Sequence, residues 1–175
     1  AQSGLTREFE MVEIELSFGS EFGGGIAAGD YDADGDIDLY VVGGNAHPNH
    51  LYQNQGDGSF VNVAATVGLA LTHRGSGPSF ADIDGDHDLD LFIGSVNSDA
   101  YYLMENQAGQ FADVTSTSGL VITAENTVSS TFSDYDLDGD LDLFLSHWGN
   151  EQRADTETVW RNNGDGTFTS ASIQT

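Results

Sequence analysis

The sequence lacks cysteine, has only 2 prolines, and carries 4 lysine and arginine residues against 29 acidic residues. Without cysteine there is no thiol nucleophile, and disulfides give no indication of the cellular compartment. The formal net charge of −25 argues against nucleic acids and anionic membranes as partners, because like charges repel. No run of about 18 apolar residues occurs, so the sequence predicts no membrane-spanning helix.

The chain has instead 22 glycines and an acidic stretch that recurs three times. The copies read DYDADGDIDLYVV, DIDGDHDLDLFIG and DYDLDGDLDLFLS. Their first residues, Asp30, Asp82 and Asp134, lie 52 positions apart at each step. An internal repeat of this length indicates a chain built from copies of one supersecondary unit.

Each copy predicts four short strands. A short apolar segment precedes the acidic stretch, and an apolar segment that suits a strand buried on both sides follows it. A hairpin then runs through a glycine turn, as in LYQNQGDGSFVNV, where we expect strands in NHLYQN and SFVNVAA. Four-stranded units of 40 to 50 residues are typical of propeller blades. The predicted fold is therefore all-β, with β-propeller blades of four antiparallel strands.

The blade count is about three, plus an N-terminal strand over residues 9–16. We expect a single repeat domain over 1–175, with an N-terminal strand region in 1–24 and repeats in 25–74, 75–126 and 127–175. Closed propellers have about four to eight blades. The chain is therefore a section of a longer protein, an open stack capped by partners, or part of a ring that identical chains complete. Each reading predicts assembly or a larger complex, because terminal blades present apolar faces.

The crowded aspartates are explained by a hard cation. Calcium takes six to eight oxygen ligands from a loop that supplies them at alternate positions. Magnesium is less suited, because it keeps water and uses few carboxylates. An EF-hand is excluded, because it needs a glutamate at position 12 and flanking helices. The sequence predicts about three Ca²⁺ ions at Asp30, Asp32, Asp34, Asp36, Asp38, Asp82, Asp84, Asp86, Asp88, Asp90, Asp134, Asp136, Asp138, Asp140 and Asp142.

The second loop departs from the other two. His87 stands at position 6, where the other copies have Gly35 and Gly139, while Gly85 stands at position 4. Two interpretations stay open. Either His87 strains a left-handed position by about 1 kcal/mol and makes this site the weakest, or Gly85 relaxes the loop and His87 points to solvent.

The segment FGGGIAAGDYDADGDIDLYVVGGNA, with Phe22-Gly23 and the acidic loop, resembles the FG-GAP repeat of integrin α-subunit propellers and the related bacterial VCBS-type repeats. The resemblance covers about residues 20 to 175, although copies two and three lack the Phe-Gly pair. It implies a β-propeller with calcium in hairpin loops on one face. It also implies a family that binds proteins or glycans, some of whose members carry carbohydrate-active enzymes.

No catalytic motif is visible, and the scattered histidines do not recur between copies. A zinc site from His47 and His147 is an alternative, but without cysteine or clustered spacing loop histidines are the simpler interpretation. Trp160 occupies a core position of the repeat, whereas Trp148 has no counterpart and is a candidate ligand surface.

We therefore expect a non-enzymatic, calcium-binding module that serves protein–protein interaction, adhesion or structural assembly. The alternatives are a glycan-binding, lectin-like propeller and a fragment of a propeller polysaccharide lyase. The opening AQSG suits a mature start after signal cleavage. The expected location is secreted, extracellular or periplasmic.

Overall fold

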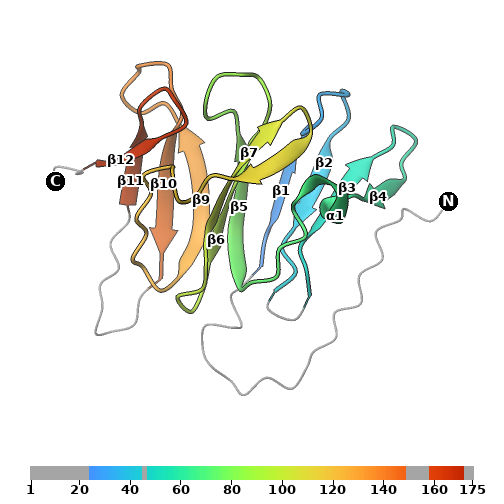
Figure 1. The fold of residues 1–175 in the computed structure, drawn as a ribbon, viewed down its shortest axis with the longest axis horizontal. Coiled ribbons are helices and arrows are strands. Elements are labelled where there is room, and N and C mark those ends of the chain that lie inside the picture. The colour runs from blue at the N-terminus through green and yellow to red at the C-terminus, as the bar shows by residue number, and fades with distance from the viewer. Residues whose placement is uncertain (1–23, 45–46, 149–157, 172–175) are drawn as a thin grey trace.

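Three four-stranded antiparallel sheets make up the fold, and in each sheet the strand order follows the chain. The computed structural model describes residues 24–44, 47–148 and 158–171. Figure 1 shows the sheets side by side across the molecule. The first sheet holds β1 (Ile26–Gly29), β2 (Asp38–Val41), β3 (His50–Asn54) and β4 (Phe60–Asn62). The second holds β5 (Gly75–Ala81), β6 (Asp90–Ser95), β7 (Tyr102–Gln107) and β8 (Gln110–Asp113). The third holds β9 (Thr127–Ser133), β10 (Asp142–His147), β11 (Thr158–Asn162) and β12 (Phe168–Ala171).

The first strands of the three sheets lie next to one another, β1 beside β5 and β5 beside β9. An isolated parallel bridge joins Gly24 to Ser76, and the Ser130 hydroxyl donates to the Gly77 carbonyl at 2.7 Å. Each sheet then extends away from this line through its second, third and fourth strands. This is the arrangement of propeller blades, and the predicted all-β class is confirmed. The expected N-terminal strand over 9–16 lies outside the described residues.

The apolar core lies between the sheets. β6, in the central sheet, is buried along its whole length, as the apolar run on both of its faces predicts. Leu91 and Ile93 belong to the cluster shared with the first sheet, and Phe92 belongs to the cluster shared with the third. Trp160 also lies in the second of these clusters, so its prediction as a core residue is confirmed.

The flanking sheets bury the equivalent residues less completely. Leu39 and Val41 of β2, which correspond to the fully buried Leu91 and Ile93, are only partly buried. Phe144 of β10, which corresponds to Phe92, is also partly buried. Among the described residues, the central sheet is thus the one that has a neighbour on both sides.

One segment differs from its prediction. The expected strand over SFVNVAA ends at Asn62, and the chain turns into the short helix α1 (Ala64–Val67). The Asn62 side chain accepts a hydrogen bond from the Ala64 amide at 3.2 Å, which starts the turn. Gly68 ends it in the left-handed conformation, with φ of 91°. In the described part of the chain, no helix is long and apolar enough to cross a membrane.

Candidate metal centres

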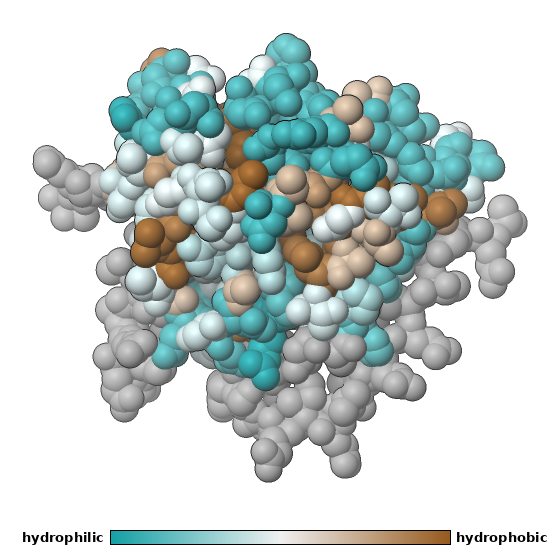
Figure 2. Space-filling view, in the orientation of Figure 1, coloured by the Kyte–Doolittle hydropathy of each residue, from teal (hydrophilic) through white to brown (hydrophobic). Residues whose placement is uncertain are grey.

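The three acidic stretches form the loops that join β1 to β2, β5 to β6 and β9 to β10. These loops lie along one edge of the molecule, at the top of Figure 1. Figure 2 shows hydrophilic residues gathered along the same edge. The structure therefore brings the carboxylates of all three repeats to a common surface.

The first aspartate of each loop holds the turn together. Asp30 accepts hydrogen bonds from the amides of Asp34 and Gly35, at 3.0 and 2.9 Å. Asp134 accepts the equivalent pair from Asp138 and Gly139. Asp82 also accepts two amide bonds, from Gly85 three residues ahead and His87 five residues ahead. Short acidic side chains favour such local bonds to the backbone. The loops are thus closed by their own aspartates.

Each loop contains two left-handed positions, the fourth and the sixth, and glycine fills one of them. The non-glycine residues at positive φ are Ala33 (58°), His87 (78°) and Leu137 (61°). Glycine occupies the other position in every loop. In the second loop the glycine stands at the fourth position instead of the sixth, and the number of non-glycine residues in the left-handed conformation is the same as in the other two loops. His87 is the easiest of the three to hold there, because histidine is enriched at positive φ.

The His87 side chain is 94% exposed, and its Nδ1 lies 3.6 Å from Asp82 Oδ2. Of the two interpretations left open by the sequence, the structure supports the one in which the histidine points to solvent. His87 does occupy a left-handed position, as the other interpretation expected, but Ala33 and Leu137 occupy one too, so this conformation does not set the second loop apart.

The aspartate at position 9 of each loop, counted from the first aspartate, is buried. Asp38, Asp90 and Asp142 are exposed by no more than 1%. Asp38 accepts hydrogen bonds from the amides of Tyr31 in its loop and Asn54 in β3, at 3.2 and 2.8 Å. Asp90 and Asp142 repeat this pattern with their own loop and third strand. Each of these carboxylates therefore joins the loop to the sheet.

Burial makes the negative charge of Asp38 and Asp90 costly. It raises the pKa of Asp38 to about 6, against the lowering effect of the Asn54 and Tyr31 amides. It raises the pKa of Asp90 to about 7 in the same way, against the Asn106 and Ile83 amides. Nearby loop aspartates raise both values further. A cation beside these side chains would favour their ionised form.

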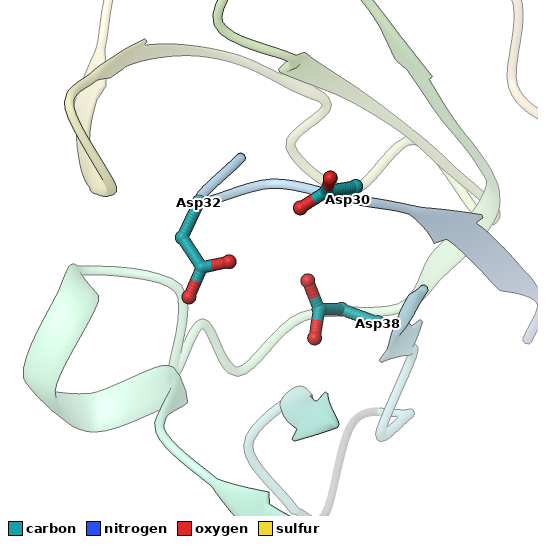
Figure 3. A group of neighbouring side chains, drawn as sticks. All are labelled: Asp30, Asp32 and Asp38. Atoms are coloured by element: carbon teal, nitrogen blue, oxygen red, sulfur yellow. The ribbon is translucent and has the colours of Figure 1, made fainter. Parts of the chain in front are cut away.

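The carboxylates converge in three groups, each with oxygen atoms within 4.8 Å of one another. The groups are Asp30, Asp32 and Asp38; Asp82, Asp84 and Asp86; and Asp134, Asp136 and Asp142. In Figure 3 the side chains of Asp30, Asp32 and Asp38 turn toward a common space. Asp32 Oδ1 is shielded from solvent there and accepts no hydrogen bond. Such an oxygen fits a hard cation, which prefers oxygen ligands.

Other predicted ligands lie outside these groups. Asp34 and Asp138 each bond to the amide two residues ahead. Asp88 accepts a hydrogen bond from the Ala108 amide, in the turn between β7 and β8, at 2.8 Å. The remaining residues not brought into a group are Asp36, Asp90 and Asp140.

The comparisons with known proteins address the repeat. The sequence model of the FG-GAP-like repeat matches residues 30–93, which span the first acidic loop, the hairpin after it and the second loop. Residues 30–93 therefore belong to an FG-GAP-like repeat. The structure agrees with this assignment, because all three copies share the loop and the strand order.

Among curated relatives, cartilage acidic protein 1 of Xenopus tropicalis is 30% identical to this chain over 141 residues, which is 78% of the chain and 21% of the relative. The human protein of the same name is 30% identical over 129 residues, 71% of the chain and 19% of the relative. The chain thus spans about a fifth of the length of these relatives. Among solved structures, a lectin of Agrocybe aegerita, titled for its recognition of non-reducing terminal N-acetylglucosamine, has a TM-score of 0.48 and 18% identity, covering 85% of this chain and 37% of the lectin.

The three repeats contain one set of residues to which sequence reasoning gave no role. Asn106 donates from Nδ2 to the Leu89 carbonyl of its own loop at 3.1 Å and to the Tyr31 carbonyl of the preceding loop at 2.8 Å. Asn162 does the same with Leu141 and with Ile83 of the preceding loop, at 3.2 and 2.7 Å. The recurrence of this asparagine in every copy was the available signal. Its acceptors are backbone groups in another repeat, which no motif marks.

Two other candidates lie away from the acidic loops. Trp148 follows β10 at the opposite end of the strand from the third loop and is 41% exposed. His147 is buried, and its ring nitrogens pair with the hydroxyls of Thr127 and Thr158 at 3.2 and 2.9 Å. His47 is exposed. Among the described residues, no group of three possible metal ligands contains His47 or His147, so the structure gives the alternative zinc site no support.

Proposed function

We propose that this chain is a calcium-stabilised part of an extracellular β-propeller that serves protein–protein interaction and assembly, without catalysis of its own. The observation that carries the proposal is the convergence of three carboxylates in each loop. In the first loop one of these oxygens, Asp32 Oδ1, is shielded and has no donor.

The residues that would hold calcium are the members of the three carboxylate groups. Bound calcium would supply positive charge among carboxylates that otherwise repel one another, and three ions would bring the formal charge from −25 to −19. In the first loop, Asp38 would keep the cation site attached to β3 through the Asn54 amide. Extracellular modules bind calcium at about 10⁻⁴ to 10⁻³ M. Such sites suit a calcium-rich location outside the cell.

Calcium removal tests the proposal. With three sites, each filled at about ten times its dissociation constant, calcium would stabilise the fold by about 4 kcal/mol. For a chain of this size, that shift corresponds to a melting temperature about 10 °C higher than without calcium. We expect this difference between melts in 5 mM calcium and in EGTA at low salt.

A matched pair of variants separates a bound ion from general charge relief. Asp32→Asn removes a member of the first carboxylate group, so we expect it to reduce the calcium stoichiometry by about one. Asp57→Asn removes the same charge from the exposed β3–β4 turn, where Asp57 pairs with Ser59. The control is expected to retain every ion. Identical melting curves with and without EGTA, together with no calcium by elemental analysis, would reject the proposal.

The outer faces of the flanking sheets support the assembly part of the proposal. Leu39 and Val41 are partly buried where their central-sheet counterparts are fully buried. Asn54 donates to the Ile37 carbonyl of its own loop at 3.2 Å, but among the described residues it meets no carbonyl of a preceding loop. We infer that another blade of the same kind covers this face. It belongs either to a longer chain or to a second copy.

Light scattering after size-exclusion chromatography tests this inference on the 175-residue chain. We expect self-association that grows with protein concentration, because the apolar outer faces would cover one another. A strictly monomeric chain of 18.6 kDa that also binds no apolar dye would contradict it.

A further inference from the structure

The three loops have the same two left-handed positions, and one side chain of the third strand beside them differs in charge from sheet to sheet. This position lies immediately before the asparagine whose backbone amide donates to the aspartate at position 9 of the loop. It is Gln53 in β3, Glu105 in β7 and Arg161 in β11. Equivalent pairings to the fourth strand fix it in the same register in every sheet. The repeat therefore places a neutral, a negative and a positive group at one location.

In all three sheets this side chain lies near the aspartate at position 3 of the loop, which is Asp32, Asp84 or Asp136. Gln53 donates from Nε2 to Asp32 Oδ2 at 2.5 Å. Arg161 Nη1 lies 4.0 Å from Asp136 Oδ2. Glu105 lines one cavity together with Asp84 of the second loop and Asp165 of the next hairpin. The aspartate at position 3 belongs to the carboxylate group of every loop.

The second loop differs from the others in two further ways, because His87 Nδ1 lies 3.6 Å from Asp82 Oδ2 and because its carboxylate group contains Asp86 in place of the aspartate at position 9. The loops are otherwise alike. Each has one non-glycine residue at positive φ. In each, the aspartate at position 9 is buried and accepts hydrogen bonds from the same two backbone amides, one in the loop and one in the third strand. The charge at the third-strand position is thus a difference that acts directly on a ligand carboxylate.

We propose that Gln53, Glu105 and Arg161 set the order of calcium affinity, with the second loop tightest, the first intermediate and the third weakest. This inference rests on the proposed function. Arg161 pairs with Asp136 and repels an incoming cation, whereas Glu105 adds a carboxylate beside Asp84 and attracts it. Gln53 is neutral, but its amide already donates to an oxygen of Asp32.

The experiment follows each loop separately in the full chain. In a calcium titration of ¹⁵N-labelled protein, the amides of Gly35, Gly85 and Gly139 report on the first, second and third loops, because each donates to its own loop's first aspartate. We expect the Gly85 signal to reach half-saturation at the lowest calcium concentration and the Gly139 signal at the highest.

Single variants then move one loop at a time. Arg161→Gln should tighten the third loop about tenfold at low salt, the size expected for a unit charge about 6 Å from a divalent ion in water. Glu105→Gln should weaken the second loop by a similar factor. Arg161→Lys keeps the charge and is expected to leave the third loop weak, which separates a charge effect from packing.

The outcomes distinguish this inference from the function on which it rests. If calcium saturates all three loops but the variants leave the order unchanged, or shift every loop equally, the inference is overturned and calcium binding stands. If Arg161→Lys tightens the third loop as much as Arg161→Gln does, charge is not the cause and the inference also fails. If no loop responds to calcium, both fall.

Discussion

Replacing Asn106 by alanine should destabilise the chain far more than the same change at Asn54. The Asn106 side chain makes three hydrogen bonds, to the Tyr31 carbonyl at 2.8 Å, the Leu89 carbonyl at 3.1 Å and the Gly109 amide at 2.8 Å. Asn106 is fully buried, so the partners left behind lose their bonds where water has poor access. The bonds to Tyr31 and Gly109 are buried and the bond to Leu89 is partly buried. At about 1 to 3 kcal/mol for each orphaned buried group and less for the third, we expect a loss of about 3 to 5 kcal/mol.

Asn54 is the matched control because it occupies the same place in the first sheet. Its side chain bonds to Ile37 and Gly56 at 3.2 and 3.1 Å, and both bonds are exposed. Water can replace those partners, so Asn54→Ala should cost about 1 kcal/mol or less. The difference of about 2 to 4 kcal/mol measures chiefly the buried contact between sheets.

Urea unfolding at a fixed, saturating calcium concentration measures both variants. With a slope of about 2 kcal/mol per molar urea, the midpoint of Asn106→Ala should lie about 1 to 2 M below that of Asn54→Ala. The backbone amide of Asn106 still bonds to Asp90 in the variant, so calcium stoichiometry should not change. Equal midpoints for the two variants would refute the idea that this asparagine joins neighbouring repeats.

Three further predictions concern the loops and the core. In calcium-free protein, the raised pKa of Asp90, about 7 against 3.8, means that the folded state binds this proton more tightly. Stability should therefore fall as pH rises from about 4 to 7, and melts of Asp90→Asn should lack part of this slope. Ala33→Gly and His87→Gly should each raise the free energy of unfolding by about 1 kcal/mol in urea titrations, and a gain at His87 alone would contradict the equal strain of the loops. Phe92→Ala should cost about 3 to 5 kcal/mol by calorimetry, because the side chain is fully buried between two sheets.

The sequence was sufficient to predict the strands and the acidic loops because both follow from local rules. Alternating aspartates with a glycine bend indicate a loop, and an apolar run such as LFIG in β6 indicates a strand buried on both faces. The sequence also predicts which aspartates form the acidic loops, but it does not predict the different role of each one. Asp38 and Asp36 look alike in the sequence, yet Asp38 is buried and joins the loop to β3 while Asp36 lies outside the carboxylate group.

Two features could not be predicted from the sequence, for different reasons. Asn106 contacts a carbonyl 75 residues earlier, and a backbone acceptor leaves no mark in the sequence. The left-handed conformation of Ala33 and Leu137 was also hidden, because side chains of these types do not indicate positive φ in a sequence. In the first and third loops this conformation accompanies closure of the loop around its first aspartate, which accepts hydrogen bonds from the amides four and five residues ahead.

The acidic loop is therefore a joint between repeats as well as a candidate ion site. Tyr31 shows this most clearly, because its amide donates to Asp38 and its carbonyl accepts from Asn106 of the next sheet. Any ion that orders this loop would also hold the Tyr31 carbonyl in place, and that carbonyl accepts a hydrogen bond from Asn106 in the next sheet. The same reasoning gives each repeat a reason to keep its own acidic loop. It leaves Asn54 without a preceding loop and the Tyr135 carbonyl without a following asparagine among the described residues, so the two ends of the row are complementary to each other.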